Sequence, residues 1–120
     1  MTRVVARLQQ PSNHELVALA RDGRQILYVA ENHVRLRDRL HGLDAAAQPL
    51  HRGDRIRRAF GAEAFRSVND GSIVLCAPLR DRWRGRRYDL IYIEVGVSES
   101  LVELLQPALR PDGTLIRIWS

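Results

Sequence analysis

Lysine is absent from this chain of 120 residues, cysteine occurs once, and long apolar runs are missing. The single cysteine, Cys76, cannot form a disulfide within the chain, and its apolar surroundings favour a buried, inert thiol. No apolar run approaches the length needed to cross a bilayer, and the first ten residues hold no long apolar segment. We therefore expect a cytoplasmic protein with one domain, residues 1–120, and no membrane contact.

The positive charge of the chain comes from arginine alone. All 19 basic residues are arginines, and the formal net charge is +5. Guanidinium groups bind phosphates as planar forks, so the excess favours nucleic acid or an acidic protein surface as a partner. GC-rich codons would explain why arginine replaces lysine, but they would not explain why positive charge exceeds negative charge.

Capping patterns predict three helices. Ser12 and Glu15 form a capping box at the start of the first helix. Asn32 is the expected cap of the second helix, and Ser98 or Ser100 that of the third. The second helix is expected to bury one row of leucines and to carry three arginines on a solvated face: Leu36, Leu40 and Leu43 inside, and Arg35, Arg37 and Arg39 outside.

Apolar runs predict the strands. The run ILYVA within 25–30 is typical of a strand buried on both faces, as in a parallel sheet covered by helices. Asn69-Asp70-Gly71 supplies the positive-φ positions of a hairpin turn between strands 64–68 and 72–77. The other expected segments are strands 3–8, 89–95 and 114–119, a turn at 110–113, a short basic helix at 54–60 and a small-residue linker at 44–49. This order predicts an α/β three-layer sandwich with a mostly parallel sheet that contains one β-hairpin.

The order of three motifs carries a family resemblance. NDGSIVL is followed by WRGRRYDLIYIEV and then by PDGTLIRIWS. This order resembles the P-loop NTPase core of phage terminase large subunits and related RecA-like ATPases. The resemblance implies a Walker A loop between the first strand and the first helix, and a Walker B strand at YDLIYIEV. It also implies a phage or prophage origin and host or phage proteins as partners.

Both catalytic motifs of that family are degraded. A Walker A loop needs glycines and a lysine to hold phosphates, whereas residues 6–14 read ARLQQPSNH and contain neither. At the Walker B position Glu94 stands for the aspartate on the Mg²⁺ side, and Val95 stands where a glutamate would activate water. We therefore expect no enzymatic activity and no cofactor, and we expect Glu94 to cap the sheet edge or to pair with a nearby arginine.

The segment before the central strand concentrates arginine around one tryptophan. Such a loop follows phosphates while an aromatic ring stacks on a base; alternatively, Trp83 packs against the sheet edge and the loop is inherited from the family. The candidate residues for binding nucleic acid or a protein partner are Arg80, Arg82, Trp83, Arg84, Arg86 and Arg87, with Arg55, Arg57 and Arg58 as support.

Other site classes lack their motifs. The four histidines show no H-E-x-x-H spacing, so we expect no metal site. A G-x-S-x-G elbow is missing, as is the glycine-rich turn that a methyltransferase-like fold, the nearest competitor, would need. The sequence thus predicts a non-catalytic binding or regulatory protein with a degenerate terminase-like fold. The alternative is a DNA-binding or accessory subunit of a nucleic-acid-processing ATPase.

Overall fold

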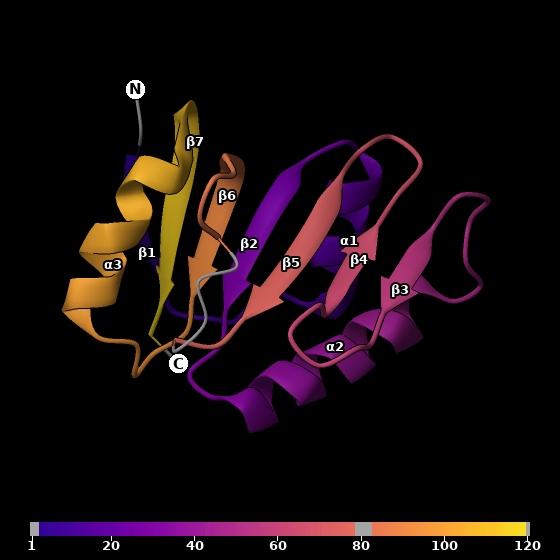
Figure 1. Ribbon diagram of the computed structural model, residues 1–120, viewed down its shortest axis with the longest axis horizontal. Coiled ribbons are helices and arrows are strands. Elements are labelled where there is room, and N and C mark those ends of the chain that lie inside the picture. Colours follow the sequence, from indigo (N-terminus) through magenta and orange to yellow (C-terminus); the bar gives the residue numbers. More distant parts are fainter. Residues whose placement is uncertain (1–2, 79–82, 120) are drawn as a thin grey trace.

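The computed structural model describes residues 3–78 and 83–119 and is built on one mixed sheet. Its strands are β1 (Arg3–Arg7), β2 (Gln25–Val29), β3 (Arg55–Arg57), β4 (Ala64–Arg66), β5 (Ser72–Cys76), β6 (Tyr88–Ile93) and β7 (Leu109–Ile118). The seven strands have the order β1-β7-β6-β2-β5-β4-β3 (Figure 1). From β1 to β5 all neighbours are parallel, whereas β4 is antiparallel to both β5 and β3. The α/β class and the largely parallel sheet are therefore confirmed.

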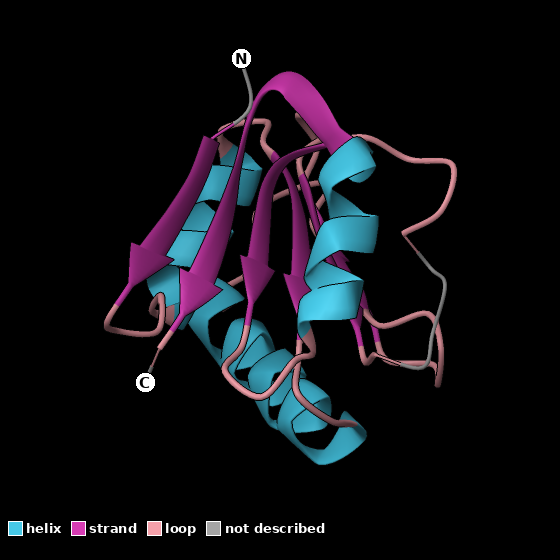
Figure 2. Ribbon diagram, turned by 90° about the vertical axis from the view of Figure 1, so that its left-hand side faces the viewer, coloured by secondary structure: helices cyan, strands magenta, loops and turns pink. Residues whose placement is uncertain are grey.

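Helices lie on both faces of the sheet. They are α1 (Asn13–Arg21), α2 (His33–Ala47) and α3 (Glu99–Leu105), which continues into the 3-10 helix η1 (Gln106–Ala108). Helices α1 and α2 pack on one face, here called the helix-pair face, and α3 packs on the other, the α3 face (Figures 1 and 2). None of the helices in the described part of the chain is long and apolar enough to span a membrane.

The expected caps fix the starts of the helices. The Ser12 hydroxyl accepts a hydrogen bond from the Glu15 N–H at 3.0 Å, and Asn32 accepts one from the Arg35 N–H at 3.0 Å. At α3 the structure selects Ser98, which accepts from the Leu101 N–H. Each cap satisfies a backbone donor that the helix itself leaves unpaired.

Strand β2 is buried on both faces, as its apolar run predicts. Ile26 and Tyr28 point into the core under α1 and α2, while Leu27 and Val29 point into the core under α3. All four side chains are fully buried. This alternation follows from the two-residue period of a strand, and it places the end of β2 at the centre of the molecule.

The prediction of a basic helix at 54–60 is wrong, because residues 55–57 form strand β3. Ile56 packs against the core of the helix-pair face, and the arginines on either side point the opposite way. Burying one alternate residue and pairing with β4 fixes an extended backbone. The antiparallel part of the sheet therefore has three strands, β3, β4 and β5, instead of the single hairpin expected.

Two further boundaries differ from expectation. Helix α2 continues to Ala47 and so takes up the first four residues of the linker predicted at 44–49, because its three consecutive alanines favour helix. Strand β7 begins at Leu109 and includes the predicted turn at 110–113. In the pairing with β6, Tyr88 lies opposite Leu109 and Leu90 lies opposite Thr114. The extra residues of β7 between these two pairs therefore form an irregularity within the strand.

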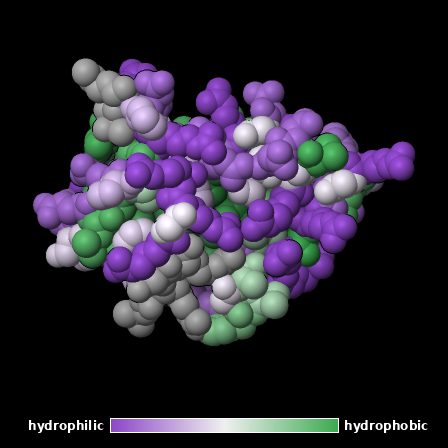
Figure 3. Space-filling model, turned by 45° about the horizontal axis from the view of Figure 1, so that its top comes forward, coloured by the Kyte–Doolittle hydropathy of each residue, from purple (hydrophilic) through white to green (hydrophobic). Residues whose placement is uncertain are grey.

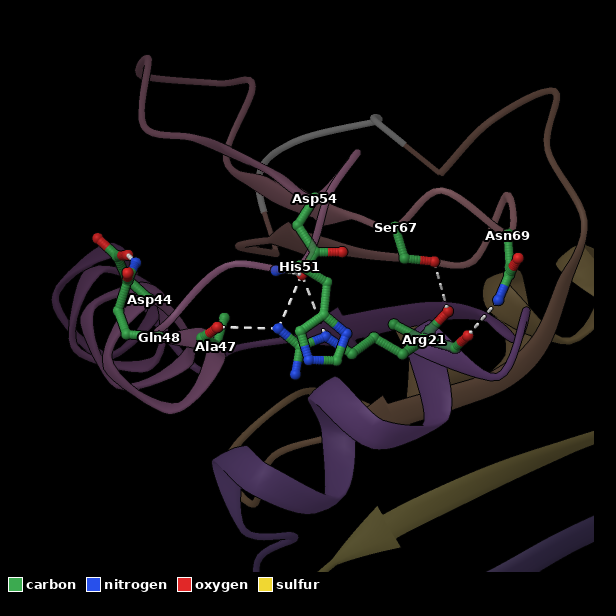
Figure 4. A network of polar contacts seen from close by, with 9 residues as sticks. Arg21, Asp44, Ala47, Gln48, His51, Asp54, Ser67 and Asn69 are labelled. Atoms are coloured by element: carbon green, nitrogen blue, oxygen red, sulfur yellow. Dashed lines mark hydrogen bonds and ion pairs between the residues drawn. The ribbon is translucent and has the colours of Figure 1, made fainter.

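Arg21, at the end of α1, holds the segment that leads from α2 to β3 (Figure 4). Its guanidinium donates to the Asp54 carboxylate at 2.7 Å and to the Ala47 carbonyl at 2.8 Å. The His51 N–H donates to the same carboxylate at 2.9 Å. The Ser67 hydroxyl donates to the Ala20 carbonyl nearby. These bonds connect α1, the end of α2 and the β4–β5 connection on the helix-pair face.

Candidate functional site: the Glu94 cluster and the basic α3 face

Glu94, at the carboxyl end of β6, is surrounded by hydrogen-bond donors. Its carboxylate accepts from the Tyr28 hydroxyl at 2.6 Å, from the Glu31 N–H at 2.8 Å and from Arg35 Nε at 2.8 Å. The side chain is buried, with 3% exposed. The expectation that Glu94 pairs with a nearby arginine is thus confirmed, and the arginine comes from the first turns of α2.

The cluster holds Glu94 in its charged form. Burial raises the pKa of the Glu94 carboxyl, but the hydrogen bonds from Arg35, Tyr28 and the Glu31 N–H together outweigh it, so the pKa lies below its ordinary value. Burial and the same hydrogen bond to Glu94 raise the pKa of the Tyr28 hydroxyl. A carboxylate held by three donors is a poor general base, since accepting a proton would cost those bonds.

Arg39, one turn after Arg35 on α2, fastens the β1–α1 loop to β2. Its guanidinium donates to the Pro11 carbonyl at 2.9 Å, the Asn13 side-chain oxygen at 2.8 Å and the Tyr28 hydroxyl at 3.0 Å. It also lies over the Tyr28 ring, 4.6 Å from the centroid. The β1–α1 loop is therefore held by an arginine from outside the loop.

The β1–α1 loop and Glu94 border one pocket of about 460 Å³ at the carboxyl ends of the parallel strands. The lining residues are Gln10, Pro11, Ser12, Asn13, His14, Arg35, Asp38, Arg39 and Glu94. Open α/β sheets bind ligands at this edge, between strands whose crossovers leave on opposite faces, as those after β2 and β6 do. Here the loop has no glycine or lysine, and Ser12 serves as the cap of α1.

Arg7, the last residue of β1, directly precedes this loop and pairs with Glu15. Its two terminal nitrogens donate to the two carboxylate oxygens at 2.7 and 2.9 Å. The hydrogen bonds from Arg7 lower the pKa of the Glu15 carboxyl. The capping-box glutamate is thus engaged in a salt bridge across the β1–α1 connection.

The prediction that the arginines of α2 form a solvated face holds only in part, because the three side chains are half-exposed and each is held by polar contacts. Arg35 binds Glu94, Arg39 binds the β1–α1 loop, and Arg37 donates to the Arg58 carbonyl at 2.8 Å and lies 3.6 Å from the Glu63 carboxylate. Sequence reasoning missed these residues because their spacing also fits an exposed helix face. One signal in the sequence could have indicated these contacts. Arg35 and Arg39 directly precede Leu36 and Leu40, which are buried, so each arginine starts beside the buried row of the helix.

The stretch RGRRYDLIYIEV is divided between the two ends of β6. Arg86 and Arg87 precede its first residue and Glu94 follows its last, so about 20 Å of strand separates them. The Trp83 ring packs into the core of the α3 face with 7% exposed, and the Arg84 guanidinium lies over it at 4.8 Å. A base therefore has no free Trp83 ring to stack on in this conformation. Two candidates, Arg80 and Arg82, lie outside the described residues.

The supporting arginines of β3 divide between the two faces. Because Ile56 faces α1 and α2, Arg55 and Arg57 project from the α3 face, the side on which Trp83 packs. Arg58 instead donates to Asp44 of α2. Four strand spacings, about 19 Å, separate β3 from β6, so the two arginine groups share a face but do not touch.

The α3 face, with the amino ends of the parallel strands, is mainly hydrophilic (Figure 3). Among the described residues no carboxylate is within ion-pair distance of Arg55, Arg57, Arg86 or Arg87, whereas the other side carries most of the paired arginines. The described part of the chain also contains no group of three histidine, cysteine or acidic side chains able to hold a metal ion. No family model, curated protein or solved structure matches the chain.

Proposed function

We propose that this is a non-catalytic nucleic-acid-binding protein with a degenerate fold of the P-loop NTPase type. The occupied carboxylate of Glu94 carries the first half of the proposal. The one acid at the tip of β6 is held by Tyr28, Glu31 and Arg35, and the next residue is Val95, which cannot orient water. A carboxylate that is occupied by these hydrogen bonds is unavailable for binding Mg²⁺ or for activating water.

The distribution of arginines supports nucleic acid as the partner. The arginines that project from the α3 face and precede β6 have no carboxylate partner among the described residues: Arg55, Arg57, Arg86 and Arg87. Among the described residues, the large exposed hydrophobic ones lie outside these segments, although one of them, Leu104, belongs to α3. Protein interfaces have an apolar or aromatic centre, whereas nucleic-acid interfaces are polar and strongly positive.

Fluorescence anisotropy with labelled duplex and single-stranded DNA over a salt series tests the binding. If the arginines contact phosphates, log affinity falls linearly with log salt, by about 0.9 per phosphate neutralised on a duplex. The double variant R86E/R87E should bind much more weakly at every salt concentration and show a shallower slope.

The control is R52E/R58E, which changes the same charge in segments tied to α1 and α2 and, unlike R86E/R87E, also breaks an ion pair, that of Arg58 with Asp44. It should retain most of the affinity. Equal losses in both variants would show that net charge alone, without a defined surface, causes binding. Separately, calorimetric titration with Mg-ATP should give no binding or millimolar binding, and micromolar affinity would overturn the degenerate-ATPase half of the proposal.

A further inference from the structure

Strand β1 ends the parallel part of the sheet with an uncovered edge. Every residue from Arg3 to Ala6 is exposed, including Val4 (56%) and Val5 (38%). Two more large hydrophobic residues, Leu8 and Trp119, are exposed at the end of the same edge. Parallel strands are normally covered on both faces and at their edges, so this edge is unusual.

The alternation of the backbone shows which groups at this edge are free. The Arg7 carbonyl accepts from the Trp119 N–H at 2.9 Å, so the polar groups of Arg7 point toward β7. In a strand the N–H and C=O of every second residue point the same way, so Arg3 and Val5 also face β7. The N–H and C=O groups of Val4 and Ala6 therefore point outward, away from the sheet.

We propose that β1 pairs antiparallel with β1 of a second copy of this chain, about a twofold axis through Val5. In this register Val4 lies opposite Ala6 of the second copy, and each such pair exchanges two backbone hydrogen bonds. The two Val5 side chains meet at the axis as a non-hydrogen-bonded pair, in which side chains are closest. The sheets of both copies then form one continuous sheet, with the same surface used twice.

The charges at the edge fit this symmetric register. Arg3 lies opposite Arg7 of the second copy, on the helix-pair face, where two bare arginines would repel each other. Arg7 is neutralised by Glu15 through two hydrogen bonds, and the Glu15 side chain is 36% exposed. Arg3, which has no carboxylate partner among the described residues, thus meets an accessible carboxylate of the second copy.

The opposite edge of the sheet cannot pair with itself in the same way. Antiparallel pairing of β3 about Ile56 would place Arg55 opposite Arg57 of the other copy. Neither has a carboxylate partner among the described residues, and like charges directly opposite each other destabilise a strand pair. The two arginines protect this edge. Self-association is therefore assigned to β1 alone.

Sedimentation equilibrium over a wide concentration range tests the dimer. The wild-type protein should approach twice the 13.7 kDa mass of the chain as concentration rises. V5K places two lysines at the axis and should raise the dissociation constant by roughly tenfold or more. The matched control is V68K, which makes the same exchange at an exposed valine after β4 and should leave the dissociation constant unchanged.

Backbone amide exchange of the wild-type protein locates the interface without any variant. The Val4 N–H should exchange slowly in the dimer and quickly on dilution, whereas the Val5 N–H should stay protected in both states. A6P removes an outward donor without removing a bond to β7, and should weaken the dimer while the circular dichroism spectrum stays folded. A monomer at all concentrations, a dimer equally sensitive to V68K, or fast exchange of Val4 in the dimer would each overturn the proposal.

Discussion

Two groups of arginines in this protein differ in what their guanidinium groups contact. The arginines of α2 bind inward: Arg35 to Glu94, and Arg39 to a loop and a tyrosine. The arginines of β3 project from the α3 face, where Arg55 and Arg57 meet no carboxylate among the described residues. The same residue type thus stabilises the fold on one side and leaves positive charge at the surface on the other.

The difference shows where arginines without an acidic partner gather among the described residues. On the helix-pair side most arginines are matched by acids, so that side contributes little to a long-range field. Among the described residues, four arginines around β3 and before β6 have no carboxylate partner: Arg55, Arg57, Arg86 and Arg87. A phosphate backbone would therefore be attracted to one side of the protein, which composition alone does not reveal.

Among the arginine variants, R35A should lose the most stability. Removing Arg35 leaves the Glu94 carboxylate buried with no cationic partner among the described residues. Removing one partner of a buried ion pair lowers the free energy of unfolding strongly. Because the Arg35 side chain is 40% exposed, we expect a loss at the lower end of the usual range for such pairs, about 3 kcal/mol. Urea denaturation followed by circular dichroism measures the loss.

A double variant separates the ion pair from simple loss of packing. E94Q keeps the shape of the side chain without its charge, so R35A/E94Q should be more stable than R35A. Two losses that simply add would mean that Arg35 acts through packing of its aliphatic part.

R39A should have the second-largest effect. It removes hydrogen bonds to Pro11, Asn13 and Tyr28 and the contact with the tyrosine ring, all to neutral groups beside an open pocket. Because water can replace part of these bonds, we expect a loss of about 1–2 kcal/mol. Amide exchange should accelerate in the β1–α1 loop. R39K should recover little, since an ammonium group cannot form the same planar fork; full recovery would contradict this account.

The stability of the protein in acid should depend on Glu94, with a smaller change in the free energy of unfolding than in R35A or R39A. The folded-state pKa of Glu94 is below its ordinary value of 4.5, so its contribution is present above that pH and is lost as pH falls through the folded pKa. Denaturation curves from neutral pH to about pH 3 should show this loss in the wild type and a shallower dependence in E94Q. Equal slopes in both would show that other carboxylates, such as Glu15, determine the acid limit.

Most of the fold follows from local patterns in the sequence. The apolar run of β2, the caps Ser12 and Asn32, and the turn before Ser72 each depend on neighbouring residues, and each was predicted correctly. The segment 54–60 failed because its conformation depends on pairing with β4, a contact that no local pattern records. Three arginines around one isoleucine, in the order Arg55-Ile56-Arg57-Arg58, fit an exposed helix and an edge strand about equally well.

The candidate site was harder to predict for the same reason. The arginine partner of Glu94 was expected, but its identity requires knowing that α2 starts beside the end of β6. Likewise, the sequence places Arg86 and Glu94 within one stretch, while the strand between them carries the two to opposite ends of the sheet. Three-dimensional proximity, which decides which charges are neutralised, is set by topology.

R55A/R57A should have the smallest effect on stability. This variant tests whether the arginines of β3, unlike those of α2, contribute little to folding. Neither guanidinium has an ion pair with a described residue, so the free energy of unfolding should change by less than about 0.5 kcal/mol. DNA affinity should nevertheless fall, because two charges leave the α3 face. If instead R55A/R57A is destabilised as much as R39A, these arginines contribute to folding as those of α2 do. The surface charge that supports nucleic-acid binding would then be confined to the start of β6.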